Sequence, residues 1–132
     1  MTWIDHYLRA TYQDGARGPD RYDCWGLVRE VRHVIYGKRL LPSWGDVRNT
    51  QPAEFTRAYR AEAATMEECA PEVGAIAACF RGSLCLHVAV VVDLGEGLRV
   101  LEIRNAKASA RLLRLTDFER EYARVIYYRD KS

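Results

Sequence analysis

The chain has 132 residues, 48% of them hydrophobic, which suits one compact domain with a single core over residues 1–132. Its 20 lysines and arginines nearly balance 18 aspartates and glutamates, and a formal net charge of +2 argues against nucleic-acid binding. No apolar segment approaches the roughly 20 residues that cross a bilayer, and residues 1–6 lack the features of a signal peptide. We therefore expect a soluble chain without membrane insertion.

Helical patterns occupy the first half of the chain. Residues 2–10 carry apolar side chains at helical spacing and predict a short amphipathic helix. Residues 24–36 place an apolar stripe on one face and stop at Gly37, which predicts a central helix. Residues 52–66 have a helix-forming composition with Pro52 in the first turn, which predicts a third helix.

The second half of the chain is typical of β-structure. Short apolar runs are punctuated by turns that contain glycine, and the predicted strands span residues 73–80, 86–93, 98–104, 110–115 and 122–129. Helices that precede strands in this way indicate an α+β domain. We expect N-terminal helices packed on a roughly five-stranded antiparallel sheet.

Cys24 stands where a polar, turn-like segment, residues 14–20, gives way to the predicted central helix. Free N–H groups and the macrodipole at a helix N-terminus favour a thiolate, so Cys24 is the candidate nucleophile. The preceding Asp23 is of a residue type that caps helices. The other cysteines show no C-x-x-C spacing with it, and we predict neither a metal site nor a cofactor.

His87 opens the apolar run of a predicted strand and is the candidate base for Cys24. A third polar group should hold the imidazole on its other nitrogen. Glu102 lies fifteen residues later, across a turn at residues 95–97, and a hairpin would bring it beside His87. Asn105 is the alternative, and it would fix the tautomer without stabilising an imidazolium. The sequence leaves both assignments open.

Stabilisation of an oxyanion is expected from the backbone N–H of Cys24 at the helix start. Tyr12, in the segment that precedes the cysteine, is the candidate side-chain donor that positions the substrate. Together these residues indicate acyl transfer through a thioester.

The segment Gly15-Ala-Arg-Gly-Pro-Asp-Arg-Tyr-Asp-Cys-Trp-Gly-Leu-Val28 resembles the NlpC/P60 family of papain-like cysteine peptidases, which cut within peptidoglycan stem peptides. Within the family, the sequence of this segment looks most like that of the phage-tail branch. By this resemblance Cys24 matches the nucleophile, His87 in His-Val-Ala-Val-Val matches the base, Glu102 falls near the third polar position, and Tyr12 matches a tyrosine before the cysteine. The resemblance covers residues 12 to about 104 and implies a papain-like fold.

The resemblance implies a peptidoglycan hydrolase of the phage tail tip that degrades the cell wall during genome entry. Its expected partners are peptidoglycan stem peptides and neighbouring tail-tip proteins. Without a signal peptide, the chain would be made in the host cytoplasm, assembled into the virion tail and delivered to the periplasm or cell wall. An alternative is a structural tail-tip or assembly protein on a peptidase scaffold with weak or no catalysis. An acyltransferase or deamidase would use the same catalytic residues.

Overall fold

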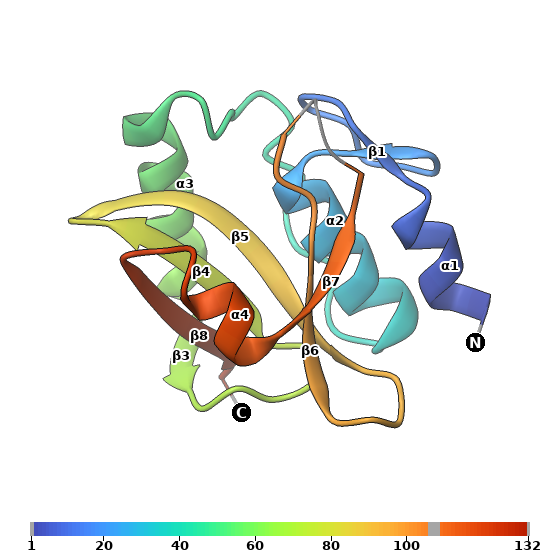
Figure 1. Ribbon diagram of the computed structural model, residues 1–132. Coiled ribbons are helices and arrows are strands. Elements are labelled where there is room, and N and C mark those ends of the chain that lie inside the picture. The colour runs from blue at the N-terminus through green and yellow to red at the C-terminus, as the bar shows by residue number, and fades with distance from the viewer. Residues whose placement is uncertain (1, 106–108, 132) are drawn as a thin grey trace.

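The computed structural model describes residues 2–105 and 109–131, and in these ranges short helices pack on both faces of one antiparallel sheet (Figure 1). The helical segments are α1 (Thr2–Leu8), α2 (Cys24–Glu30), the π-helical turn η1 (Val31–Ile35), α3 (Pro52–Ala63) and α4 (Leu115–Glu119). The predicted α+β class is confirmed.

The main sheet has six strands within the described residues, in the order β3-β8-β4-β5-β6-β7. The strands are β3 (Met66–Cys69), β4 (Ile76–Arg81), β5 (Leu84–Asp93), β6 (Leu98–Glu102), β7 (Arg111–Arg114) and β8 (Arg124–Asp130). A small parallel pair, β1 (Thr11–Tyr12) and β2 (Arg21–Tyr22), lies beside α1. Each of the five predicted main-sheet strands is present.

The prediction of about five strands is wrong by one, because β3 was not expected. Its sequence Met-Glu-Glu-Cys has no alternation of apolar residues that would indicate a strand. It forms because it lies at the sheet edge, where it pairs with β8 and where charged side chains are tolerated. Glu67 there accepts a 2.7 Å hydrogen bond from Arg129 on β8.

The predicted central helix is present but changes its geometry midway. It is α-helical to Glu30 and continues as the π-helical turn η1, in which the N–H of Tyr36 donates to the carbonyl of Val31. The wider turn coincides with a buried arginine, Arg32, whose Nε donates to the carbonyl of Gly74 at 2.8 Å. This contact ties the end of the helix to the loop before β4.

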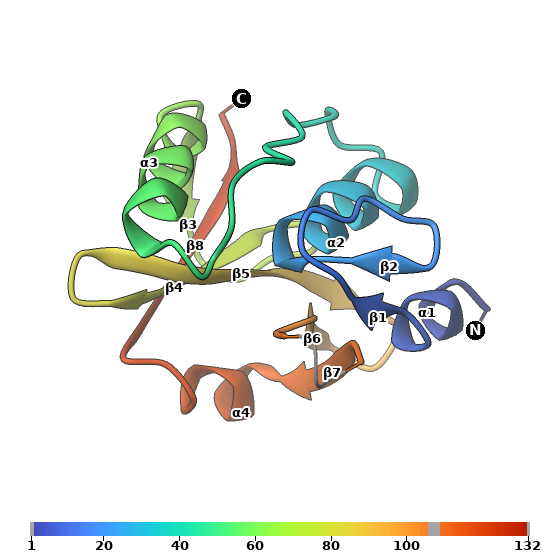
Figure 2. The same cartoon turned by 90° about the horizontal axis from the view of Figure 1, so that it is seen from above.

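Helices cover the two faces of the sheet unequally. Seen from above, α2 and α3 lie on one face and α4 lies on the other (Figure 2). The larger core fills the face of α2 and α3, and a smaller core around Phe118 fills the face of α4. Alternation along β5 therefore matters for the site, because Val88 and Val90 belong to the larger core and Ala89 and Val91 to the smaller.

Within the described residues, no helix has both the length and the apolar character needed to cross a bilayer.

Candidate active site

Asp23 fixes the start of α2. One of its carboxylate oxygens accepts from the N–H of Gly26 at 2.8 Å and from Arg17 at 2.7 Å, and the other accepts from the N–H of Gly15 at 3.0 Å. The first contact caps the helix, and the other two hold residues 15–17 against it. The capping role expected of Asp23 thus extends to the loop in front of Cys24.

Gly26 allows this loop to approach the helix. A Cβ atom at this position would lie 2.3 Å from the carbonyl oxygen of Ala16 and 3.1 Å from Arg17 Nη1. Backbone is difficult to move, so any larger residue would displace the loop from the helix start. Close packing of the loop on α2 therefore explains why the Asp-Cys-Trp-Gly motif has glycine at this position.

Replacing Gly26 with alanine is expected to lower the free energy of unfolding by about 1–3 kcal/mol, the usual cost of overpacking. The sign is informative, because glycine to alanine in an unobstructed helix interior is stabilising by up to about 1 kcal/mol. Urea unfolding measures the change. Gly45→Ala is the matched control, since its new Cβ would meet only Ser43 Oγ, at 3.4 Å. Equal stability of both variants would contradict the close packing of Ala16 on α2.

Cys24 is the first residue of α2 and is 2% exposed. Burial, followed by the charge of Asp23, raises the pKa of its thiol well above the ordinary value, and the backbone N–H groups of Val88 and Trp25 only partly oppose this. The helix start favours a thiolate, as expected, but it is not the largest influence on this thiol. Desolvation outweighs the helix terminus, and Cys24 is a protonated thiol at neutral pH.

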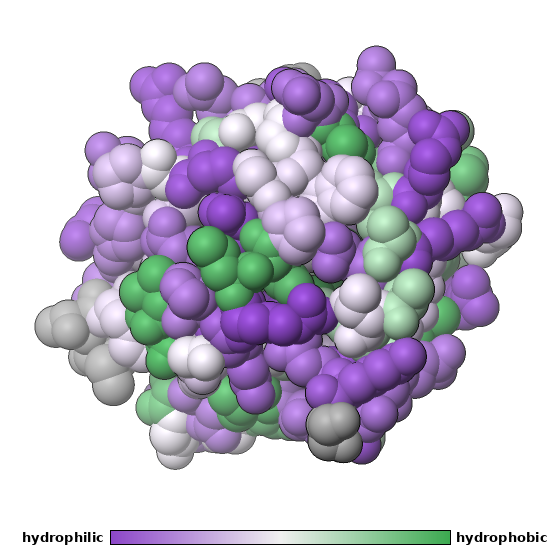
Figure 3. Space-filling model, turned by 180° about the vertical axis from the view of Figure 1, so that it is seen from behind, coloured by the Kyte–Doolittle hydropathy of each residue, from purple (hydrophilic) through white to green (hydrophobic). Residues whose placement is uncertain are grey.

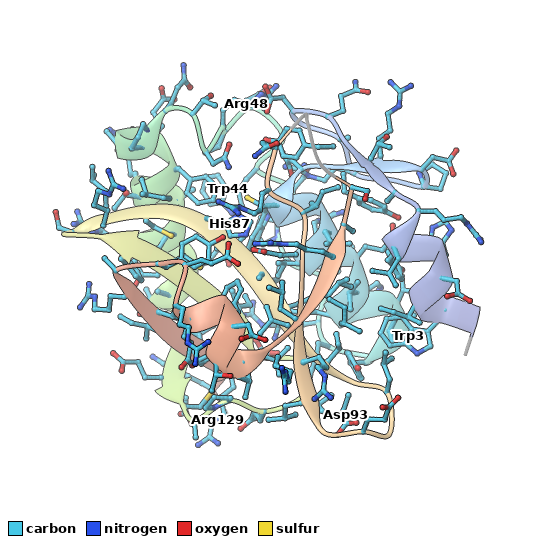
Figure 4. All side chains as sticks on the ribbon, in the orientation of Figure 1. Trp3, Trp44, Arg48, His87, Asp93 and Arg129 are labelled. Atoms are coloured by element: carbon cyan, nitrogen blue, oxygen red, sulfur yellow. The ribbon has the colours of Figure 1, made fainter. Side chains whose placement is uncertain are left out.

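His87 follows an irregularity in β5. Cys79 of β4 pairs with His87, whereas the next residue, Phe80, pairs with Cys85, so Leu86 is an extra residue in the ladder. Such a bulge turns the strand locally and changes the direction of neighbouring side chains. His87 is 4% exposed and lies near the middle of the molecule (Figure 4).

Glu102, the last residue of β6, lies beside His87. His87 Nε2 is 2.8 Å from Glu102 Oε1, and Glu102 is 0% exposed. Burial opposes ionisation, but the hydrogen bond from His87 and the charge of Arg111 lower the pKa of the Glu102 carboxyl overall. An ionised carboxylate only accepts, so Nε2 carries the proton and Nδ1 is the basic nitrogen. Asn105, the alternative partner, lies exposed in the bend that follows.

Cys24 and His87 reach β5 from different sides. His87 shares the face of the smaller core with Cys79, its cross-strand partner, whereas α2 packs on the opposite face through Val88. Among the described residues, no hydrogen bond joins the thiol to the imidazole. They are connected through the backbone. Val88 follows His87 in the chain, and its N–H is hydrogen-bonded to the Cys24 thiol, which lowers the pKa of that thiol.

Tyr12 lies close enough to Cys24 for a thiolate there to raise the pKa of its hydroxyl, although burial and the bond to Asp14 raise it more. The hydroxyl donates to Asp14 at 2.7 Å and also lies 3.3 Å from an amide oxygen of Asn49. Its hydrogen is therefore engaged within the loop. A substrate would have to replace Asp14 as the acceptor.

Two residues that sequence analysis missed complete the surroundings of the imidazole. The ring of Tyr122 stacks on His87 with 5.7 Å between centroids, and its hydroxyl donates to Glu102 Oε1 at 3.0 Å. Arg111 donates to Glu102 Oε2 at 2.6 Å. Only the β6–β7 register, which pairs Glu102 with Arg111, could have indicated the arginine beforehand.

An apolar cavity lies on the other face of the sheet, between α2, α3 and the strands. Its few polar side-chain groups are hydrogen-bonded within the protein: Trp44 donates to Glu62 at 2.9 Å, Trp25 donates to the carbonyl of Pro42 at 2.9 Å, and the hydroxyls of Tyr59 and Tyr128 are hydrogen-bonded to each other. Figure 3 shows the outside of this helical face, where hydrophobic residues reach the surface in patches among hydrophilic ones. The cavity is therefore lined mainly by apolar atoms. It is separate from the cluster of polar side chains around His87.

Within residues 2–105 and 109–131, no three or more His, Cys, Asp and Glu side chains group in a way that could hold a metal ion. Comparison with known proteins adds no identity to this geometry, because no protein-family model and no curated protein matches the chain.

Proposed function

We propose that the chain is a phage tail-tip cysteine peptidase that hydrolyses peptidoglycan stem-peptide bonds during cell-wall penetration. The observation that carries the chemistry is the buried hydrogen bond of 2.8 Å between His87 and Glu102, directly beside the strand residue whose N–H acts on the Cys24 thiol. The resemblance to NlpC/P60 peptidases supplies the substrate, the papain-like fold, the tail-tip partners and the delivery to the cell wall.

The first step requires His87 Nδ1 to reach the Cys24 thiol from the other side of β5. Cys24 Sγ then attacks the scissile carbonyl carbon while Nδ1 takes the thiol proton. Transfer to His87 creates a thiolate and an imidazolium together, which costs less in a buried site than a lone thiolate. The imidazolium then gives the proton to the leaving amine as the C–N bond breaks. The product at this stage is a thioester on Cys24.

In the second step a water gives its proton to His87 and attacks the thioester carbonyl, which releases the acid and restores the thiol. The oxyanion forms near the helix start. Among the described residues the backbone N–H of Cys24 donates no hydrogen bond, so it can stabilise that charge. Tyr12 would add a second donor once its hydroxyl leaves Asp14.

Alkylation by iodoacetamide tests the paired chemistry. Burial raises the pKa of Cys85 to about 12 and also raises that of Cys24, so an unassisted thiol at either position reacts slowly at pH 7. We expect Cys24 to react at least about tenfold faster than Cys85, and His87→Ala to remove that advantage. Mass spectrometry of the labelled peptides reads both rates. Equal rates at the two cysteines in the unaltered chain would exclude an activated pair.

The buried, protonated state of Cys24 favours a second candidate, a structural tail-tip or assembly protein on the same scaffold. A structural protein of this kind is expected to form a stoichiometric complex with tail proteins, and the Cys24→Ala variant should form that complex as well as the unaltered chain does. Incubation with purified muropeptides separates the two candidates and also the acyltransferase or deamidase. Only hydrolysis of a peptide bond releases both a new amino terminus and a new free carboxyl group, whereas acyl transfer joins that carbonyl to a second acceptor and deamidation releases ammonia.

A further inference from the structure

Glu102 brings a full negative charge to a dry site. A carboxylate that acts alone on an imidazole at low dielectric stabilises the imidazolium strongly. His87 would then keep its second proton and could not accept the proton of Cys24. The geometry must therefore let Glu102 orient the ring without holding that proton on it.

Arg111 supplies the opposite charge from the neighbouring strand. Its Nε and Nη2 both lie 2.6 Å from Glu102 Oε2, while Oε1 accepts from His87 and from the hydroxyl of Tyr122. The two oxygens thus divide their roles. One is neutralised by the guanidinium, and the other orients the ring.

Arg111 also forms an ion pair with a second carboxylate, that of Glu121. Glu121 Oε1 is 2.6 Å from Arg111 Nη2 and 2.9 Å from Arg104 Nη1. Glu102, Arg111, Glu121 and Arg104 therefore form a chain of alternating sign whose formal charges cancel. The guanidinium of Arg104 also lies over the ring of Tyr122, 5.9 Å from its centroid.

The remaining titratable groups around the imidazole are neutral near pH 7. Burial raises the pKa of the Tyr122 hydroxyl, and it likewise raises the pKa values of the thiols of Cys79 on β4 and of Cys85 on β5, the latter to about 12. The Cys24 thiol on α2 is protonated for the same reason. The charges that act on the ring are those of the alternating chain.

We propose that Arg111 is a positioning residue that neutralises Glu102, so that Glu102 orients His87 through Oε1 without its full charge acting on the ring. The role rests on the proposed function of His87 as the base. Arg111 acts through Glu102, and among the described residues no hydrogen bond joins its guanidinium to the imidazole.

The titration of the three histidine rings by NMR tests the proposal, with His6 and His33 as internal references. Arg111→Gln is expected to move the titration midpoint of His87 up by about one pH unit, because the carboxylate is no longer countered. Glu121→Gln should move it down, because the full charge of Arg111 then acts on Glu102. Arg111→Lys, which keeps the cation, should restore the midpoint of the unaltered chain.

Arg114→Gln is the matched control, with the same charge change on the same strand but on a side chain that is 73% exposed. The proposal is overturned if Arg111→Gln leaves His87 unmoved, or moves it no more than Arg114→Gln does. If Arg111→Gln does not fold, Glu121→Gln tests the proposal instead: a downward shift of the His87 midpoint supports it, and no shift overturns it. The midpoint is read on the ring itself, so these shifts in a chain that cleaves nothing would refute the proposed function and leave this electrostatic role intact.

Discussion

Replacing Cys24 with alanine is expected to reduce hydrolysis of purified muropeptides to the background rate, a loss of at least about 10⁴-fold. The sulfur forms the covalent bond to the substrate in the proposed mechanism, and no neighbouring group in that mechanism can replace it. Liquid chromatography of the digested muropeptides, with detection of the new amino terminus, measures the loss. The fold should be retained, because only one buried atom is removed and the expected cost is about 1 kcal/mol.

Cys69→Ala is the control for this substitution. Cys69 lies on the edge strand β3, far along the sheet order from β5, and should keep full activity. Cleavage that persists in Cys24→Ala would show that the activity comes from another group or from a contaminant, and the nucleophile assignment would be abandoned. Cleavage lost in both variants would point to a general effect of cysteine replacement on the fold.

The position of Cys24 could be read from the sequence because it depends on local signals. A turn-rich segment, a capping residue and the onset of an apolar helical stripe meet at one residue, and the structure begins α2 there. Glu102 was also within reach, because the turn at residues 95–97 and the alternation along two strands limit which side chains can lie side by side. The structure places Glu102 2.8 Å from His87.

The protonation state of Cys24 could not be read in this way. Its burial depends on how the loop at residues 15–17, held by Asp23 and Arg17, packs over the helix start, and that packing is tertiary. The helix terminus, which favours a thiolate, is a local signal in the sequence, whereas the larger effect, desolvation of the thiol, depends on tertiary packing. A partner that accepts the proton is therefore more important than the helix dipole.

Arg111 and Tyr122 were missed for a related reason. Tyr122 comes from the turn after α4, a helix that the sequence did not predict, and it reaches His87 only because α4 packs on the far face of the sheet. Arg111 was visible only as one of several basic residues in the C-terminal third. The register of β6 with β7 turns this charge toward a buried carboxylate, and that register is not visible in the composition.

Glu102→Ala is expected to lower the free energy of unfolding by about 3 kcal/mol at pH 7, because it leaves the polar groups that face the carboxylate without their partner. The effect should depend on pH in a defined direction. The folded-state pKa of Glu102 lies below its ordinary value of 4.5, so the carboxylate stabilises the fold above about pH 4.5 and loses this contribution as the pH falls through the folded-state value. Urea unfolding at pH 7 and in an acidic series measures the difference between the two chains.

Glu96→Gln is the matched charge control, since Glu96 lies exposed in the turn between β5 and β6, and its removal should change stability by less than about 0.5 kcal/mol. A deficit in Glu102→Ala that stays constant into acid would mean that side-chain packing, rather than the ionised carboxylate, accounts for it. A deficit that shrinks with acid ties the stability of the fold to the group that orients His87. Loss of cleavage in the same variant would then follow from the freed imidazole, because its proton could move to either nitrogen and Nδ1 would no longer be held as the base.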